Sequence, residues 1–86
     1  MDIIILFTSY YFANKIDRIL TEQRIEFTLI AVPPEISSAC GMAIRIKPDR
    51  LDIVQEIMTS HHISPSHIYW YRKGEEPRLY KGKKET

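Results

Sequence analysis

The stretch Asp2-Ile3-Ile4-Ile5-Leu6-Phe7-Thr8 decides the fold, because it is a run of apolar and β-branched side chains without alternation. Such a run is typical of a central strand that is buried on both faces. Working outward, we expect further strands at 26–32, 40–47 and 66–71, where short apolar stretches alternate with other residues or end at prolines. Apolar residues at three- and four-residue steps predict one helix from Ser9 to about Arg24 and a second from Pro48 to before Ser64.

A faint internal repeat relates the two halves of the chain. At a spacing of 38 residues, Ile16 aligns with Val54 and Ile19 aligns with Ile57. Each half then consists of strand, helix and strand, and two interleaved halves give the ferredoxin-like βαββαβ arrangement. We therefore predict an α+β two-layer sandwich, with both helices on one face of an antiparallel sheet of strand order 4-1-3-2.

The repeat also assigns the two faces of the first strand. It aligns Leu6 with Ile44, which predicts that Ile4 and Leu6 face the helices. The opposite face would then carry three apolar side chains with no helix above them: Ile3, Ile5 and Phe7. Because such a face is usually covered by a partner or another segment, we expect a homodimer through the open sheet face, or a tail folded across it.

Length, charge and cysteine content limit the class of protein. Eighty-six residues, 44% of them apolar, allow one domain. We place this domain at residues 1–71 and a basic C-terminal tail at 72–86, where six basic and three acidic residues give a net charge of +3, against −2 for the rest. The total of +1 favours neither nucleic acid nor membrane. One cysteine, and Asp2 where a secretory signal would have a basic residue, predict a cytoplasmic protein without an internal disulfide.

Cys40 is the candidate chemical centre. Antiparallel pairing of the first and third predicted strands would bring it beside the start of the first helix, whose positive end stabilises a thiolate. Hydroxyl groups and a glycine around this point can bind an anion or admit a ligand: Thr8, Ser9, Ser37, Ser38 and Gly41. The alternative interpretation is that Cys40 is a small packed hydrophobe, with the serines as ordinary loop residues and Gly41 as a bend.

The segment Ser37-Ser38-Ala39-Cys40-Gly41-Met42-Ala43-Ile44-Arg45 resembles the signature of the selenium/sulfur carrier-like family of small bacterial domains. The likeness extends over roughly residues 2–71. It implies that Cys40 accepts sulfur or selenium as a persulfide or selenopersulfide, in a carrier rather than an autonomous enzyme, and we assign Arg45 to partner or anion binding. The implied partners are a donor, such as a cysteine desulfurase, and an acceptor enzyme. We expect no cofactor. Family members tend to end both helices with glycine, where this chain has Arg24 and His62.

Two other functions compete with the carrier hypothesis. A non-catalytic dimeric interaction module would keep Cys40 as a structural residue. The aromatic run Tyr69-Trp70-Tyr71 together with the basic tail suggests a small nucleic-acid-binding domain, but the RNP pattern is missing and packing explains the aromatic residues better. Three histidines lack zinc-ligand spacing, so we expect no metal site: His61, His62 and His67.

Overall fold

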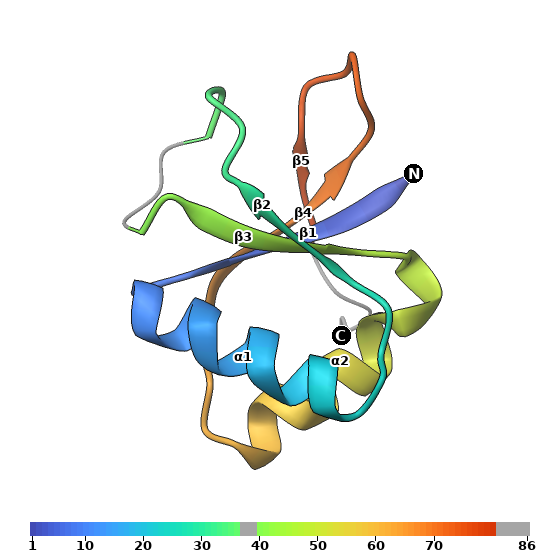
Figure 1. Cartoon of the computed structure of the whole chain (residues 1–86). Helices are drawn as coiled ribbons and strands as arrows, with labels where there is room; N and C mark the ends of the chain where they lie inside the picture. Colours follow the sequence, from blue (N-terminus) through green and yellow to red (C-terminus); the bar gives the residue numbers. More distant parts are fainter. Residues whose placement is uncertain (37–39, 81–86) are drawn as a thin grey trace, which may run out of the picture.

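The computed structural model describes residues 1–36 and 40–80. Their elements, in chain order, are β1 (Asp2–Phe7), α1 (Tyr10–Glu22), β2 (Thr28–Ala31), β3 (Met42–Ile46), the 3₁₀ turn η1 (Pro48–Arg50), α2 (Leu51–Ser60), β4 (Pro65–Tyr71) and β5 (Arg78–Leu79). Both helices cover one face of the sheet, while the segment after β2 and the β4–β5 hairpin rise on the other side (Figure 1). No helix of the described residues is long and apolar enough to cross a membrane.

The strands form one antiparallel sheet in the order β2-β3-β1-β4-β5. The strand β1 lies at its centre between β3 and β4, as its uninterrupted apolar sequence predicts. The α+β class with two helices on an antiparallel sheet is therefore confirmed. The complete sheet does not match the predicted four-stranded order 4-1-3-2, because β5 adds a fifth strand beside β4; the four predicted strands themselves follow that order when read from the β4 side.

The strand β5 comes from the segment that the sequence analysis assigns to the C-terminal tail. The chain turns back after β4 at Gly74, which has a φ of 87°. Tyr80 then donates its backbone N–H to the carbonyl of Ile68 over 2.8 Å. Its ring packs on Trp70 with the ring centroids 5.5 Å apart. Because one aromatic anchor is enough to hold a polar segment on the sheet, residues up to Tyr80 belong to the folded unit.

The main core lies between the sheet and the helices, and it contains Ile3, Ile5 and Phe7. The face assignment drawn from the repeat is therefore wrong for β1. In the β1–β3 ladder Ile5, not Leu6, lies opposite Ile44, and directly opposite residues share a face. The repeat aligns this strand one residue out of step, and a shift of one residue reverses every side chain of a strand.

The second face of the sheet is covered by the chain itself. Ile4, Leu6 and Ala43 are each 0% exposed although no helix lies above them. Side chains from β4, β2 and the segment after β2 pack on them: Tyr69, Tyr71, Ile30, Val32 and Ile36. The apolar side chains that suggested a dimer through this face are turned toward the helices, so they give no reason for a partner there.

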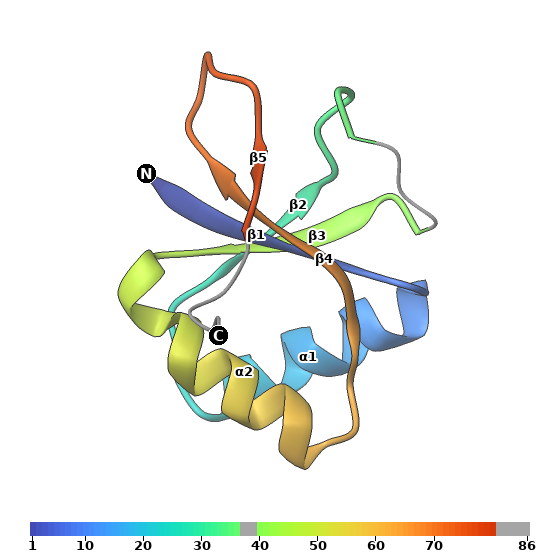
Figure 2. The same cartoon turned by 180° about the vertical axis from the view of Figure 1, so that it is seen from behind.

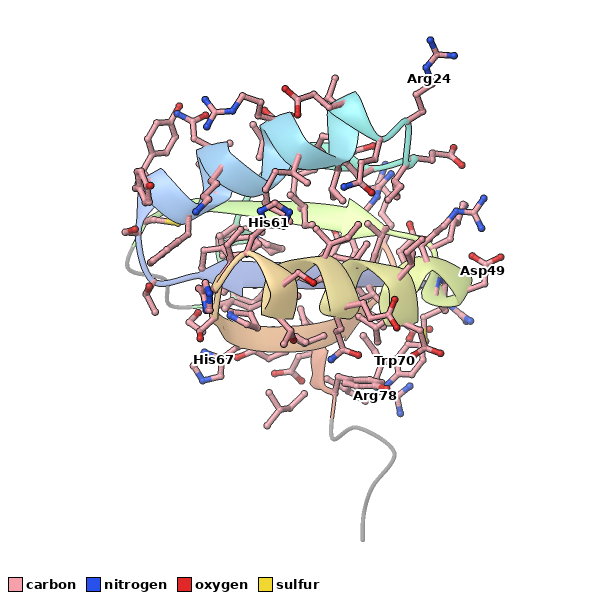
Figure 3. The ribbon with its side chains drawn as sticks, turned by 90° about the horizontal axis from the view of Figure 1, so that it is seen from below. Arg24, Asp49, His61, His67, Trp70 and Arg78 are labelled. Carbon is pink, nitrogen blue, oxygen red and sulfur yellow. The ribbon has the colours of Figure 1, made fainter. Side chains whose placement is uncertain are left out.

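Both helices end in a left-handed residue that is not glycine. Arg24 has a φ of 60° and His62 has a φ of 59°. After α1, the amide of Ile25 donates to the carbonyl of Leu20 over 3.0 Å. After α2, the amide of Ile63 donates to the carbonyl of Met58 over 2.8 Å. These are Schellman motifs, which normally place glycine at the left-handed position. The two ends lie apart because the helices run antiparallel, with Arg24 after α1 and Asp49 before α2 toward the same side of the molecule (Figure 3).

Candidate functional site

Cys40 lies directly before Gly41 and β3, and it is a free, half-buried cysteine. Its thiol donates to the backbone carbonyl of Met42 over a sulfur–oxygen distance of 3.2 Å. On its inner side it packs against the edge of the core beneath the sheet. The sulfur is thus held by packing while part of the residue stays open to solvent. The Met42 carbonyl is not among the groups predicted for the site, because a backbone acceptor leaves no signal in the sequence.

The start of β3 and the first turn of α1 lie at the same end of the molecule, as both views show (Figures 1 and 2). Leu6 pairs with Ala43 in an antiparallel ladder, so the residues after Leu6 and the residues before Ala43 extend toward the same end of the sheet. Ser9 lies three residues after Leu6, and Cys40 lies three residues before Ala43. Both residues therefore lie just beyond the paired strands, at the same end of the sheet. Ser9 is the N-cap residue of α1, but its side chain makes no capping hydrogen bond. The first-turn N–H groups therefore lack the side-chain acceptor that usually neutralises this positive end.

Two other predicted residues lie at this end of the sheet. Thr8 is exposed between β1 and α1. Gly41 has a φ of 76°, and a methyl group added to it would meet no atom within 4 Å. Glycine is therefore required there by the backbone conformation and not by lack of space. Its carbonyl accepts the amide of Val32 over 3.0 Å, which prolongs the β2–β3 pairing. Ser37 and Ser38 lie outside the described residues.

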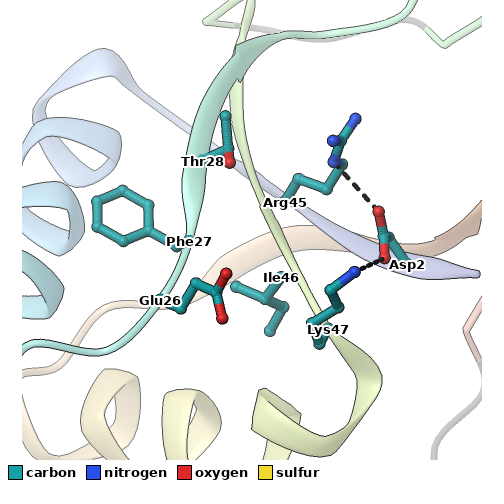
Figure 4. A pocket seen from close by; sticks show the side chains of 7 residues that line it. All are labelled: Asp2, Glu26, Phe27, Thr28, Arg45, Ile46 and Lys47. Atoms are coloured by element: carbon teal, nitrogen blue, oxygen red, sulfur yellow. Dashed lines mark ion pairs between the residues drawn. The ribbon is translucent and has the colours of Figure 1, made fainter.

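Arg45 is not brought to Cys40. It lies five residues further along the same strand, about 16 Å away at the usual rise of a strand, and it pairs with Ile4 on the second face of the sheet. There its Nε is 3.2 Å from a carboxylate oxygen of Asp2, and Lys47 Nζ is 3.8 Å from the other oxygen. These side chains border a hollow of about 140 Å³, which is completed by Glu26, Phe27, Thr28 and Ile46 (Figure 4).

The remaining candidates form no joint site. Among residues 1–36 and 40–80, no three His, Cys, Asp or Glu side chains come together in a group that could hold a metal ion. All three histidines are exposed, and His61 and His67 lie on different elements (Figure 3). The aromatic residues of β4 alternate between the faces: Tyr69 and Tyr71 pack on the second face and Trp70 on the helix side. They therefore do not form one continuous platform for stacking bases.

Fold and site together define a small α+β domain with a free, partly accessible thiol directly before β3, whose start lies at the same end of the molecule as the start of α1. Residues 2–70 match the family model described as "Putative Se/S carrier protein-like", and the chain belongs to this family. The match includes Cys40 and ends before β5. The family predicted from the segment around Cys40 is thereby confirmed. No curated protein and no solved structure gives a significant match.

Proposed function

We propose that this protein carries sulfur or selenium on Cys40 and delivers it to a partner enzyme. The observation that carries the proposal is the family match over residues 2–70, which contains the chain's one cysteine. The position of that cysteine supports it, because a half-buried thiol at the end of the sheet can be reached by another protein. A thiol that must stay reduced between transfers suits the cytoplasm.

The transfer needs no external oxidant or reductant. The Cys40 thiolate attacks the terminal sulfur of a donor persulfide, a new sulfur–sulfur bond forms, and the donor leaves as a thiolate. Cys40 then bears the persulfide. In delivery, a thiolate of the acceptor enzyme attacks the terminal sulfur and Cys40 leaves as the thiolate. A terminal selenium would be passed on by the same two displacements.

The groups around Cys40 take different parts in this scheme. The Ser9 side chain leaves the first-turn N–H groups of α1 uncapped, so these groups are available to a bound anion. The hydroxyls of Thr8, Ser9, Ser37 and Ser38 hold the anionic persulfide, and Gly41 gives the bend that presents the cysteine. Arg45 acts in recognition of a partner or an anion, since it lies too far along β3 to touch the sulfur.

The hydrogen bond between the thiol and the Met42 carbonyl belongs to the resting state. It needs the sulfur-bound proton, so it is lost when the thiol ionises. The thiolate then turns away from the carbonyl oxygen, because two electron-rich atoms repel each other. In this scheme the bond holds the empty carrier in one rotamer and releases the side chain for attack.

The test is to load the full chain with a cysteine desulfurase and cysteine and to measure its intact mass. We expect the mass of one added sulfur atom, removable by a reducing agent and absent from Cys40→Ser. Arg78→Gln is the matched control, which should load normally because residue 78 lies on β5 at the opposite edge of the sheet and has no part in the proposed site. Ser9→Ala should load more slowly while its fold is unchanged. An unmodified wild-type chain, or equal loading of Cys40→Ser, would refute the proposal.

A further inference from the structure

Within the part of the chain that the structure describes, the strand β2 forms one edge of the sheet. It is the terminal strand in the order β2-β3-β1-β4-β5, so no described strand pairs with its outer side. Residues 27–32 contain no charge and no proline. Natural edge strands are normally protected by charged residues, prolines, bulges or covering elements. The opposite edge follows this rule, because β5 is only two residues long and carries Arg78.

Some backbone N–H and C=O groups of β2 point away from β3 at this edge. The amide of Val32 bonds to the carbonyl of Gly41 on the β3 side. In an antiparallel ladder only every second residue bonds to a given neighbouring strand. The backbone N–H and C=O groups of Thr28 and Ile30, like those of Val32, therefore point toward β3. Leu29 and Ala31 then direct their N–H and C=O groups outward, where no described residue is bonded to them.

We propose that β2 pairs antiparallel with β2 of a second copy of this chain, about a two-fold axis perpendicular to the sheet. An axis centred on Leu29 or on Ile30 keeps each face continuous, so Leu29 stays on the helix side and Ile30 on the second face. Both centres place the outward amides of Leu29 and Ala31 opposite carbonyls of the second copy. Pro33 has no N–H and ends the ladder.

The uncharged sequence of β2 favours a second copy of this chain as the partner that pairs with it. A two-fold contact needs a surface that is complementary to itself, and an uncharged strand places no like charges opposite one another. The pairing also covers the side chains of Leu29 and Ile30, which are half-buried in the single chain. This interface is at the sheet edge, not at the sheet face, and it does not depend on the carrier function.

The test combines the molar mass of the full chain in solution with amide hydrogen exchange. Light scattering or sedimentation should show a monomer that converts to a dimer as the concentration rises. The amides of Leu29 and Ala31 should exchange rapidly in the monomer and become protected in the dimer. Ile30 and Val32 should be protected in both, because their amides bond within the chain.

Ala31→Pro removes an outward amide from each copy without breaking the ladder to β3. We expect the dimer dissociation constant to rise roughly 30-fold, for two lost backbone hydrogen bonds per dimer. Ala31→Ser is the matched control, which keeps the amide and should dimerise like the wild type. If the proline variant does not fold, Ala31→Lys places a charge in the contact and should weaken it. The inference is overturned by a monomer at all concentrations, by a dimer with unprotected Leu29 and Ala31, or by pairing with a foreign peptide only.

Discussion

Replacing the left-handed residues at the helix ends with glycine should stabilise the domain. Arg24 has a φ of 60°, and an L residue in this conformation is strained by about 1–2 kcal/mol. Glycine removes the strain, but it makes the unfolded chain more flexible, which offsets about 0.4–1 kcal/mol. Arg24→Gly should therefore raise the free energy of unfolding by about 0.5–1 kcal/mol. His62→Gly should gain less, because histidine tolerates this region better than most residues.

The assay is thermal and urea unfolding followed by circular dichroism. A gain of 1 kcal/mol shifts the melting temperature of a domain of this size by about 4–8 °C, so Arg24→Gly should melt about 2–8 °C higher. The gains of the two substitutions should add, because they lie at separate helix ends. Arg24→Ala is the control, since it removes the guanidinium and keeps the strain. If Arg24→Ala stabilises as much as Arg24→Gly, or if Arg24→Gly destabilises, the backbone argument is refuted.

Three further substitutions test the structure. Gly41→Ala should lower the free energy of unfolding by about 1 kcal/mol in urea titrations despite the open space around it, because its φ is 76°; an unchanged midpoint would contradict this. Asp2→Asn should change stability by less than about 1 kcal/mol at low salt and not at high salt, because its ion pair with Arg45 is exposed to solvent; a large, salt-independent loss would refute this. Tyr80→Ala should lose about 1–3 kcal/mol and shift the fluorescence of Trp70, the single tryptophan, to the red, whereas Tyr80→Phe should not; normal fluorescence in the alanine variant would show that the ring contact is unimportant.

The parts of the fold that follow from local pattern could be predicted from the sequence. The unbroken apolar run of β1 requires burial on both faces, and this placed it at the centre of the sheet. Which residues of β1 face the helices could not be predicted, because the ladder sets Ile5 opposite Ile44 and the repeat is one residue off. The strand β5 was missed because two residues carry no pattern, and it is held by pairing with the distant strand β4 and by the ring contact between Tyr80 and Trp70.

In the candidate site too, features set by local pattern could be predicted, whereas features set by the pairing of distant strands could not. The antiparallel order of β1 and β3 predicted Cys40 beside Thr8 and Ser9, at the end of the sheet where α1 begins. The start of β3 lies at that end, and the grouping of these side chains into one site stays a prediction. The assignment of Arg45 to partner or anion binding stays a prediction. The alternation along β3 that puts Met42 on one side of the sheet puts Arg45 on the other. Its partner Asp2 is distant in sequence, and only the strand register brings the two together.

The central position of β1 has a consequence for synthesis of the protein. Leu6 pairs with Ala43 and Ile3 pairs with Trp70, so β1 finds neither neighbour during synthesis until these later strands have followed. Until then, a strongly hydrophobic β-forming segment is exposed on the nascent polypeptide, where such segments are prone to aggregate. Residues 2–7 would therefore need shielding by a chaperone until β3 and β4 have emerged from the ribosome.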